Sequence, residues 1–178
     1  ENPYLKDFYA DMQRWAFHSQ LFFLSHRLRS HRSLAEDSAS VVQDRSIYED
    51  AEVFARNLYE EGALSDRDWG TYQNLYHTLA GLLPAPDLVV YLRASVATLK
   101  QRIAKRGRGF ESGISDEYLE GLNRLYEDWI ESFTLAPVLI IPADRLDFVE
   151  HSADLAAIAK TVENRLNQKQ GSLFPTGM

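Results

Sequence analysis

The sequence contains no cysteine among its 178 residues, and this absence narrows the chemistry of the protein. Without cysteine there can be no disulfide bond, no thiolate nucleophile and no cysteine-ligated metal. Basic residues are also scarce, because 19 lysines and arginines face 26 aspartates and glutamates, which gives a net charge of −7. An acidic chain is a poor general ligand for nucleic acids or anionic membranes, so we expect neither as a partner.

Long hydrophobic runs and leader features are absent as well. No stretch approaches 18 consecutive apolar residues, so no transmembrane span is predicted. The first four residues, Glu-Asn-Pro-Tyr, lack the features of a signal peptide, and we therefore expect a cytoplasmic protein. The length and the 45% hydrophobic content predict a single globular domain over residues 1–170, followed by a loose tail at 171–178.

Apolar patterning predicts strands that alternate with helices. We expect strands at 39–43, 88–92 and within 137–142. We expect helices at 5–29, 49–61, 65–82, 96–106, 115–133 and 151–167, with irregular chain at 30–38 and a glycine-rich loop at 107–114. The second strand is continuously apolar, which is typical of a buried parallel strand. Strand–helix alternation predicts an α/β fold with a parallel sheet.

Local signals mark several of these helix ends. Ser65, Ser95 and Ser115 stand where N-caps are expected, because a serine hydroxyl can accept a hydrogen bond from a free backbone N–H of the first turn. Gly62 and Gly107 stand where helices should stop, since glycine readily adopts the left-handed conformation that ends a helix. These five positions predict the helix boundaries around the strands.

The most informative stretch follows the first predicted strand. Asp44, Arg45 and Ser46 come directly after a short β-branched run, and a second acid, Asp50, lies six residues after the first. The carboxyl ends of strands in open α/β sheets are where ligands bind. There the aspartate could face Mg²⁺ or a metal-bound water, while the arginine faces a hydroxyl or a phosphate.

Polar residues also form a stripe on the first predicted helix. Tyr9, Gln20 and Arg27 fall within about 20° of one another at 100° per residue, with the small Ala16 between them. The rest of this helix is apolar nearly all round, which indicates burial. Either these groups are solvated or bonded to backbone, or they contact a polar ligand, because burying them unpaired is costly.

A basic cluster follows the second predicted strand. Arg102, Lys105, Arg106 and Arg108 lie within seven residues and run into a Gly-x-Gly sequence. The helix dipole favours one or two cations at a helix C-terminus, but it does not call for four. Guanidinium groups on a loop of this kind suit the clamping of a phosphoryl group in transfer, and a solvated basic face is the alternative.

Together and in this order, the motifs resemble those of the deoxynucleoside kinases, most closely the bacterial deoxyguanosine and deoxyadenosine kinases. Three spaced motifs carry the resemblance: Trp15 with Tyr9, Gln20 and Arg27; Asp44-Arg45-Ser46 with Asp50; and Arg102-x-x-x-Arg106-Gly-Arg108-x-x-Glu111. The resemblance implies a P-loop NTPase-type, three-layer fold with a parallel sheet. It also implies transfer of the γ-phosphoryl group of ATP to the 5′-hydroxyl of a deoxynucleoside with Mg²⁺, and a homodimer.

The resemblance assigns the substrate-binding roles by position. Gln20 would pair with the nucleobase edge, supported by Arg27 and Asp50, while Tyr9 and Glu111 would hold the sugar 3′-hydroxyl. A carboxylate and a guanidinium that orient each other and an amide can read an exocyclic amine or a carbonyl. The resemblance therefore points to purine deoxynucleosides, deoxyguanosine ahead of deoxyadenosine.

The catalytic and donor-binding roles follow in the same way. Arg45 would contact the 5′-oxygen, and Asp44 would lie near the metal. Three arginines would form a lid that neutralises the transferring phosphoryl group: Arg102, Arg106 and Arg108. Arg102 would also stack on the donor base, with Asp147 and Phe148 on the other side of that base.

One family motif is absent from this sequence. No Gly-x-x-x-x-Gly-Lys-Ser/Thr phosphate-binding loop occurs in it, and neither does the strand ending in Glu-Pro that carries the family's general base. That segment also supplies the central strand, so the strands at 39–43 and 88–92 are expected to lack a common neighbour. We expect that these 178 residues by themselves do not catalyse phosphoryl transfer.

Two other functions stay open on the sequence. A thymidylate-kinase-like nucleoside monophosphate kinase shares the Asp-Arg pair and the basic lid, but it needs further cations for the phosphate of its acceptor. A non-catalytic subunit of a kinase heterodimer would explain a missing phosphate loop, but it would leave the retained substrate and lid residues unexplained.

Overall fold

The computed structural model describes residues 2–107 and 114–171, whose contacts divide the chain into two compact units. The first unit comprises Glu1–Pro84 and Arg124–Trp129, and the second comprises Ala85–Asn123 and Ile130–Met178. The single domain expected over 1–170 stays a prediction.

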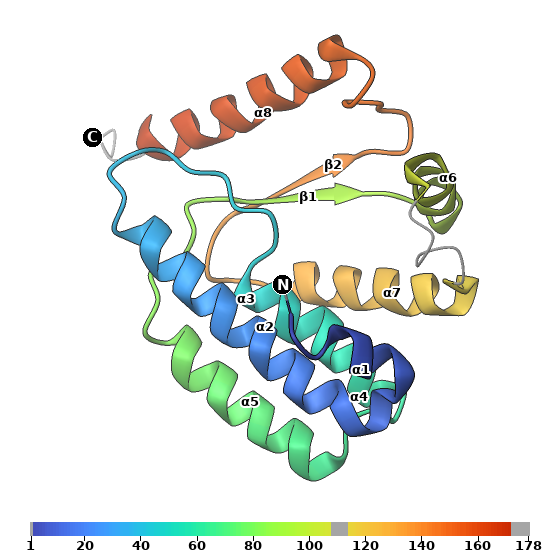
Figure 1. The fold of residues 1–178 in the computed structure, drawn as a ribbon. Helices are drawn as coiled ribbons and strands as arrows, with labels where there is room; N and C mark the ends of the chain where they lie inside the picture. Colours follow the sequence, from blue (N-terminus) through green and yellow to red (C-terminus); the bar gives the residue numbers. More distant parts are fainter. Residues whose placement is uncertain (1, 108–113, 172–178) are drawn as a thin grey trace. The chain divides into compact units, whose positions relative to one another are not determined.

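The elements described in the first unit are helices, which are joined by irregular segments such as residues 36–46 (Figure 1). Its helices are α1 (Leu5–Ala10), α2 (Met12–Ala35), α3 (Ile47–Glu49), the π-helix η1 (Asp50–Ala55), α4 (Arg56–Glu60) and α5 (Asp66–Ala80). The long α2 packs against α1, α5 and the α3–η1 segment. Leu24, Ile47, Tyr48, Val53 and Tyr72 are almost fully buried and form the centre of this unit.

The helix expected at 5–29 is in fact two helices that meet at Asp11. This residue leaves the helical region (φ −150°, ψ 88°), and its carboxylate accepts a hydrogen bond from the backbone N–H of Arg14 at 3.1 Å. The aspartate thus ends α1 and caps α2, which is a common use of a short acidic side chain. Tyr9 therefore lies on a different helix from Gln20 and Arg27.

The second helix also continues further than expected. Residues 30–35 are helical rather than irregular, and α2 ends at Ala35. His31 accounts for part of this, because its ring is buried against Tyr48 and its Nε2 lies 3.0 Å from the carbonyl oxygen of Pro84. The polar composition of 30–35 indicated a loop, but tertiary contacts of one residue in it overrode that preference.

The strand expected at 39–43 does not form. Val42 is completely exposed, Val41 is 45% exposed, and within the described residues no strand pairs with this segment. A β-branched run favours an extended chain, but a strand exists only where a neighbour completes its hydrogen-bond ladder. The prediction of a strand here was wrong, although the lack of a common neighbour with the next strand had been expected.

The second unit contains the parallel sheet. Strands β1 (Val89–Arg93) and β2 (Val138–Pro142) pair in parallel with Val89 opposite Val138, and the connection between them carries α6 (Val96–Arg106) and α7 (Asp116–Ser132). Helix α8 (Ser152–Gly171) follows β2 (Figure 1). This arrangement confirms the α/β class with a parallel sheet.

Strand β1 is less buried than its continuous apolar sequence predicted. Val90 and Leu92 keep 37% and 39% of their surfaces exposed. The described sheet has two strands, and β1 pairs with β2 alone, so no described strand lies along the other edge of β1. The expectation of a fully buried strand was therefore wrong for the described part of the chain.

The predicted helix ends are confirmed. The hydroxyl oxygens of Ser65, Ser95 and Ser115 accept hydrogen bonds from backbone N–H groups three residues on, at 3.2, 3.3 and 3.2 Å. Gly107 ends α6 in the left-handed region at φ 67°. None of the described helices combines the length and the apolar content that a membrane span would need.

Substitutions of two glycines test whether the left-handed conformation at the end of α6 requires glycine. Gly107→Ala forces a side chain into the left-handed region, although the added Cβ meets nothing within 4 Å. We expect it to lower the free energy of unfolding by about 1 kcal/mol. Gly70→Ala, inside α5 and also without a steric contact, is expected to raise it by about 0.5–1 kcal/mol. Urea unfolding followed by circular dichroism measures both; equal effects of the two substitutions would contradict the assignment.

Candidate functional site

The Asp44-Arg45-Ser46 turn joins the extended segment 41–43 to helix α3 in the first unit. Arg45 adopts a left-handed conformation at φ 63°, which is uncommon for a residue with a side chain. Ser46 then caps α3, because its hydroxyl oxygen accepts a hydrogen bond from the backbone N–H of Glu49 at 3.3 Å. Backbone strain of this kind concentrates at functional positions. The conformation turns the chain sharply between the acid and the helix.

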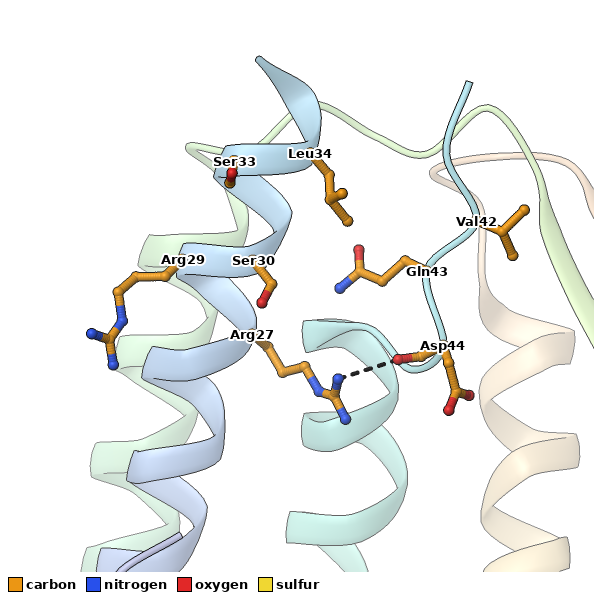
Figure 2. Close-up of a pocket in the computed structure, with 8 residues that line it drawn as sticks. All are labelled: Arg27, Arg29, Ser30, Ser33, Leu34, Val42, Gln43 and Asp44. Carbon is orange, nitrogen blue, oxygen red and sulfur yellow. Dashed lines mark hydrogen bonds between the residues drawn. The ribbon is translucent and has the colours of Figure 1, made fainter. Parts of the chain in front are cut away.

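Arg27 on α2 holds this turn in place. Its Nε donates to Asp50 Oδ2 at 3.1 Å, and its Nη1 donates to the main-chain carbonyl oxygen of Asp44 at 3.2 Å. Figure 2 shows the second of these bonds, which spans from α2 to the turn. One guanidinium thus connects α2, the turn and η1, which brings together three of the residues that the sequence singled out.

Asp50 is deeply buried for a carboxylate. It is only 4% exposed, and burial raises its pKa above the usual value for an aspartate. Arg27 opposes this shift through its charge and its hydrogen bond, and the charges of Arg45 and His26 oppose it to a smaller degree. The net direction is upward, so desolvation outweighs the ion pair. Asp50 is held mainly as the partner that fixes the orientation of Arg27.

Gln20 lies two helical turns before Arg27 on the same face of α2. Seven residues of helix place the two Cα atoms about 10.5 Å apart along the axis. Gln20 is buried, and no hydrogen bond joins its side chain to any described residue. Its donor and acceptor are available to a polar ligand.

Tyr9 does not share this face. It lies on α1 beyond the break at Asp11, and it is 59% exposed. The helical arithmetic that aligned it with Gln20 and Arg27 assumed one continuous helix, and that assumption was wrong. Its role in holding a sugar hydroxyl stays a prediction.

A pocket of about 510 Å³, lined by both polar and apolar groups, opens beside the Asp44-Arg45-Ser46 turn (Figure 2). Residues of α2 and of the segment before the turn line it: Arg27, Arg29, Ser30, Ser33, Leu34, Val42, Gln43 and Asp44. The Nε2 atom of Gln43 is buried there without a hydrogen-bond partner. The pocket therefore offers donors on the side of Arg27 that faces the extended segment.

The side chain of Arg45 rests on an aromatic ring that sequence reasoning missed. Its guanidinium carbon lies 4.1 Å from the centroid of the Phe54 ring, within the range of a cation–π interaction. Phe54 belongs to η1, and π-helical turns are rare and frequently mark functional sites. No periodic signal announces a π-helix, so the pairing of Arg45 with Phe54 could not be read from the sequence.

In the second unit, Arg102 and the loop after β2 come together. Arg102 Nη2 donates to the carbonyl oxygens of Ala143 and Leu146 at 2.5 and 2.9 Å, and its guanidinium lies 5.7 Å from the ring centroid of Phe148. Lys105 pairs with Asp147 at 3.2 Å and with Glu150 at 3.3 Å. Arg102 and Lys105 of α6 thus contact the loop that carries Asp147 and Phe148.

Of the other residues that we assigned to the lid and the sugar, only Arg106 lies within the described part of α6 and the loop after it. Arg106 is exposed in the last turn of α6. Arg108 and Glu111, to which we assigned lid and sugar-binding roles, lie outside the described residues. The lid and donor roles of all these side chains stay predictions.

The turn can accept a divalent cation through one carboxylate. No group of three or more potential metal ligands occurs among the described residues. The Asp44 side chain is exposed, and no described residue donates a hydrogen bond to its carboxylate. Magnesium is commonly held by one or two carboxylates together with phosphates and waters. Asp44 fits that mode of binding.

Comparison with known proteins gives consistent matches over nearly the whole chain. The family model described as deoxynucleoside kinase matches residues 1–167. The chain is 34% identical over 171 residues to the deoxyadenosine/deoxycytidine kinase of Bacillus subtilis, covering 95% of this chain and 79% of that protein. It is 34% identical to the deoxyguanosine kinase of the same organism, covering 92% and 80%.

Solved structures agree with these sequence matches. The deoxyadenosine kinase of M. mycoides with bound dATP superposes with a TM-score of 0.76 at 30% identity, covering 92% of this chain and 82% of that one. The same enzyme with the products dCMP and a flexible dCDP superposes with a TM-score of 0.78 at 29% identity, over the same shares of the two chains.

The two hydrogen bonds from Arg27 to Asp50 and to the Asp44 carbonyl oxygen are called the Arg27 clamp below. Removing this clamp is predicted to destabilise the protein in a pH-dependent way. Arg27→Met leaves the Asp50 carboxylate buried and unpaired, so we expect the free energy of unfolding at pH 7.5 to fall by about 2–3 kcal/mol. Removing Arg27 raises the pKa of Asp50 further, and protonation at lower pH relieves the unpaired charge. The deficit should therefore shrink toward pH 5.

Arg32→Met is the matched control on the same helix. Arg32 pairs with Glu36 in an exposed ion pair, so its removal should produce no measurable change at either pH. Urea unfolding of the three proteins at both pH values measures the difference. Equal destabilisation by the two substitutions, or a deficit that does not depend on pH, would contradict the clamp.

Proposed function

Because this chain belongs to the deoxynucleoside kinase family, we propose that it takes part in transfer of the γ-phosphoryl group of ATP to the 5′-hydroxyl of a purine deoxynucleoside. We also propose that these 178 residues by themselves do not catalyse the transfer, because they contain no Gly-x-x-x-x-Gly-Lys-Ser/Thr loop. The observation that carries the proposal is that Arg27, paired with the buried Asp50, shares one face of α2 with Gln20, whose amide has no hydrogen bond to a described residue. Deoxyadenosine and deoxyguanosine recur in the names of the relatives, which supports a purine acceptor. We place deoxyguanosine ahead of deoxyadenosine.

Gln20 would read the edge of the nucleobase. An amide presents a donor and an acceptor side by side, and a purine edge presents a complementary pair. Arg27 cannot rotate freely, because Asp50 and the Asp44 carbonyl fix its guanidinium. A fixed cation on the same face of α2 as the amide favours a carbonyl or ring-nitrogen acceptor on the base. Tyr9 and Glu111 would hold the sugar hydroxyl.

The Asp44-Arg45-Ser46 turn would bind the 5′ end of the nucleoside, where the reaction takes place. Arg45 would contact the 5′-oxygen, and Asp44 would hold Mg²⁺. When bound, ATP with Mg²⁺ supplies the phosphoryl group and neutralises part of its charge. The chain contributes orientation, since the strained turn and the Arg27 clamp limit where these two side chains can point.

Arginines of the second unit would neutralise charge on the phosphoryl group. Arg102 sits against Phe148 with two backbone hydrogen bonds, so its guanidinium is positioned before a nucleotide binds. Arg106 and Arg108 would add positive charge, and Asp147 and Phe148 would flank the donor base with Arg102. Stabilisation by fixed charges is the principal means of catalysis in phosphoryl transfer.

The comparisons favour a nucleoside kinase over a monophosphate kinase or a non-catalytic subunit. The clamp agrees with them, because a monophosphate acceptor needs spare cations, and Arg27 is already committed to Asp50 and the Asp44 carbonyl. A homodimer and a cytoplasmic location stay predictions.

Calorimetry on the 178-residue chain tests the acceptor class. We expect deoxyguanosine and deoxyadenosine to bind, thymidine to bind at least about tenfold more weakly, and dGMP to bind no more tightly than deoxyguanosine. Tenfold tighter binding of dGMP would indicate a monophosphate kinase. Absence of binding by deoxyguanosine, deoxyadenosine and deoxycytidine would favour the non-catalytic subunit.

Two glutamines of α2 give the matched variants for this experiment. Gln20→Leu removes the proposed base-reading amide and should weaken deoxyguanosine binding about tenfold. Gln13→Leu makes the same chemical change at an exposed position of that helix and should leave the affinity unchanged. Equal affinity of the two variants for deoxyguanosine would show that Gln20 does not bind the nucleobase.

A further inference from the structure

We propose that Tyr126 of α7 is a positioning residue that fixes Arg45 through two intermediaries, Phe54 and Glu49. The proposal rests on the proposed function only where it gives Arg45 the 5′-oxygen as its target. All four residues belong to the first unit, because Arg124–Trp129 of α7 are part of it. The relatives' names assign no role to Tyr126 or Glu49.

The guanidinium of Arg45 needs an external support. Its side chain is exposed, and among the described residues no carboxylate lies within ion-pair distance of it. The contact that it does make is with the face of Phe54, at 4.1 Å from the ring centroid. The direction in which Arg45 points therefore depends on where the Phe54 ring is held.

Tyr126 holds that ring. The rings of Phe54 and Tyr126 meet edge to face, with centroids 6.2 Å apart and an interplanar angle of 90°. This geometry is favourable because the positive edge of one ring meets the negative face of the other. The stack of Arg45 on Phe54 thus continues to Tyr126.

The hydroxyl of Tyr126 reaches Arg45 by a second route. It donates a hydrogen bond to Oε1 of Glu49, the last residue of α3. Burial raises the pKa of Glu49 as the largest effect, while the Tyr126 hydrogen bond and then the charge of Arg45 lower it. Glu49 and Arg45 therefore attract each other, and Tyr126 both orients the carboxylate and favours its ionised form.

Two further acids influence whether Glu49 is ionised. Asp44 in the turn and Asp50 in η1 also act on Glu49, and both raise its pKa. Together with Arg45 and Tyr126, these two aspartates are the charged and titratable groups that act on the Glu49 carboxylate. Three acids close to a single turn repel one another, so a protonated Glu49 would relieve repulsion but would lose its pull on Arg45.

An ion pair fixes the position of α7 relative to Arg45, Phe54 and Glu49. Arg124, two residues before Tyr126, pairs with Glu60 on α4 at 2.5 Å. The two residues lie on α7 within one turn, so the ion pair and the tyrosine hydrogen bond seat the same stretch of helix. Tyr126 acts on the turn through its hydroxyl group, which contacts Glu49, and through its ring, which contacts Phe54.

The experiment compares Tyr126→Phe with Tyr59→Phe. The first removes one hydroxyl and keeps the ring against Phe54. The second removes a hydroxyl that donates to Asp66 at 3.2 Å, away from the turn, and is the matched control. Carboxyl-carbon NMR follows the Glu49 titration, and side-chain ¹⁵N NMR follows the Arg45 Nε–H signal.

In Tyr126→Phe we expect the Glu49 titration to move to higher pH and the Arg45 Nε–H signal to shift. Neither signal should change in Tyr59→Phe. An unchanged Glu49 titration in Tyr126→Phe, or an unchanged Arg45 signal, overturns the proposal. These two NMR measurements need no ligand. They therefore test the positioning role of Tyr126 even if the proposed function is wrong.

Ligand binding adds a readout that a purely structural role would not move. Tyr126→Phe should weaken deoxyguanosine binding about fivefold and leave 2′,5′-dideoxyguanosine, which lacks the 5′-oxygen, within about twofold. Equal weakening of both ligands would show that Tyr126 merely supports the fold. If wild-type protein binds neither ligand, the acceptor assignment fails while the NMR result stands on its own.

Discussion

A single guanidinium, that of Arg27, joins the three elements on which the candidate site depends. It bonds the buried carboxylate of Asp50 on η1 and the main-chain carbonyl of Asp44 in the turn, and it projects from the helix that carries Gln20. Removing a charge from water is costly unless it is paired, and here burial still raises the pKa of Asp50. The pair is therefore better understood as a device that fixes geometry than as a source of stability.

That geometry explains how an acidic chain can belong to a family of nucleotide-binding phosphotransferases. Positive charge is placed at defined points instead of being spread over a surface. Arg27 is tied to the turn, Arg45 rests on Phe54, and in the second unit Arg102 is bonded to two carbonyl oxygens beside Phe148. Each guanidinium is fixed by an aromatic ring, a carboxylate or backbone, so little side-chain freedom is left to lose when a ligand binds.

Local signals in the sequence predicted the helix caps and the motif residues, and the Arg27–Asp50 pairing followed from the family resemblance. Features that depend on partners were missed. The β-branched run at 39–43 has strand propensity but no described neighbour, and Asp11 breaks a helix whose apolar pattern runs straight through it. The contact between Glu49 and Tyr126 spans 77 positions in the chain and leaves no periodic trace. The π-helix that carries Phe54 has no such signature either.

A crystal structure of the protein with deoxyguanosine bound tests the central claim most directly, namely that the Arg27 clamp presents Gln20 to the base and Arg45 to the sugar. The account predicts hydrogen bonds from the Gln20 amide to the guanine edge and from Arg45 to the 5′-oxygen, with the Arg27–Asp50 bond kept. A nucleoside bound elsewhere, or bound here with the Arg27–Asp50 bond broken, would contradict it.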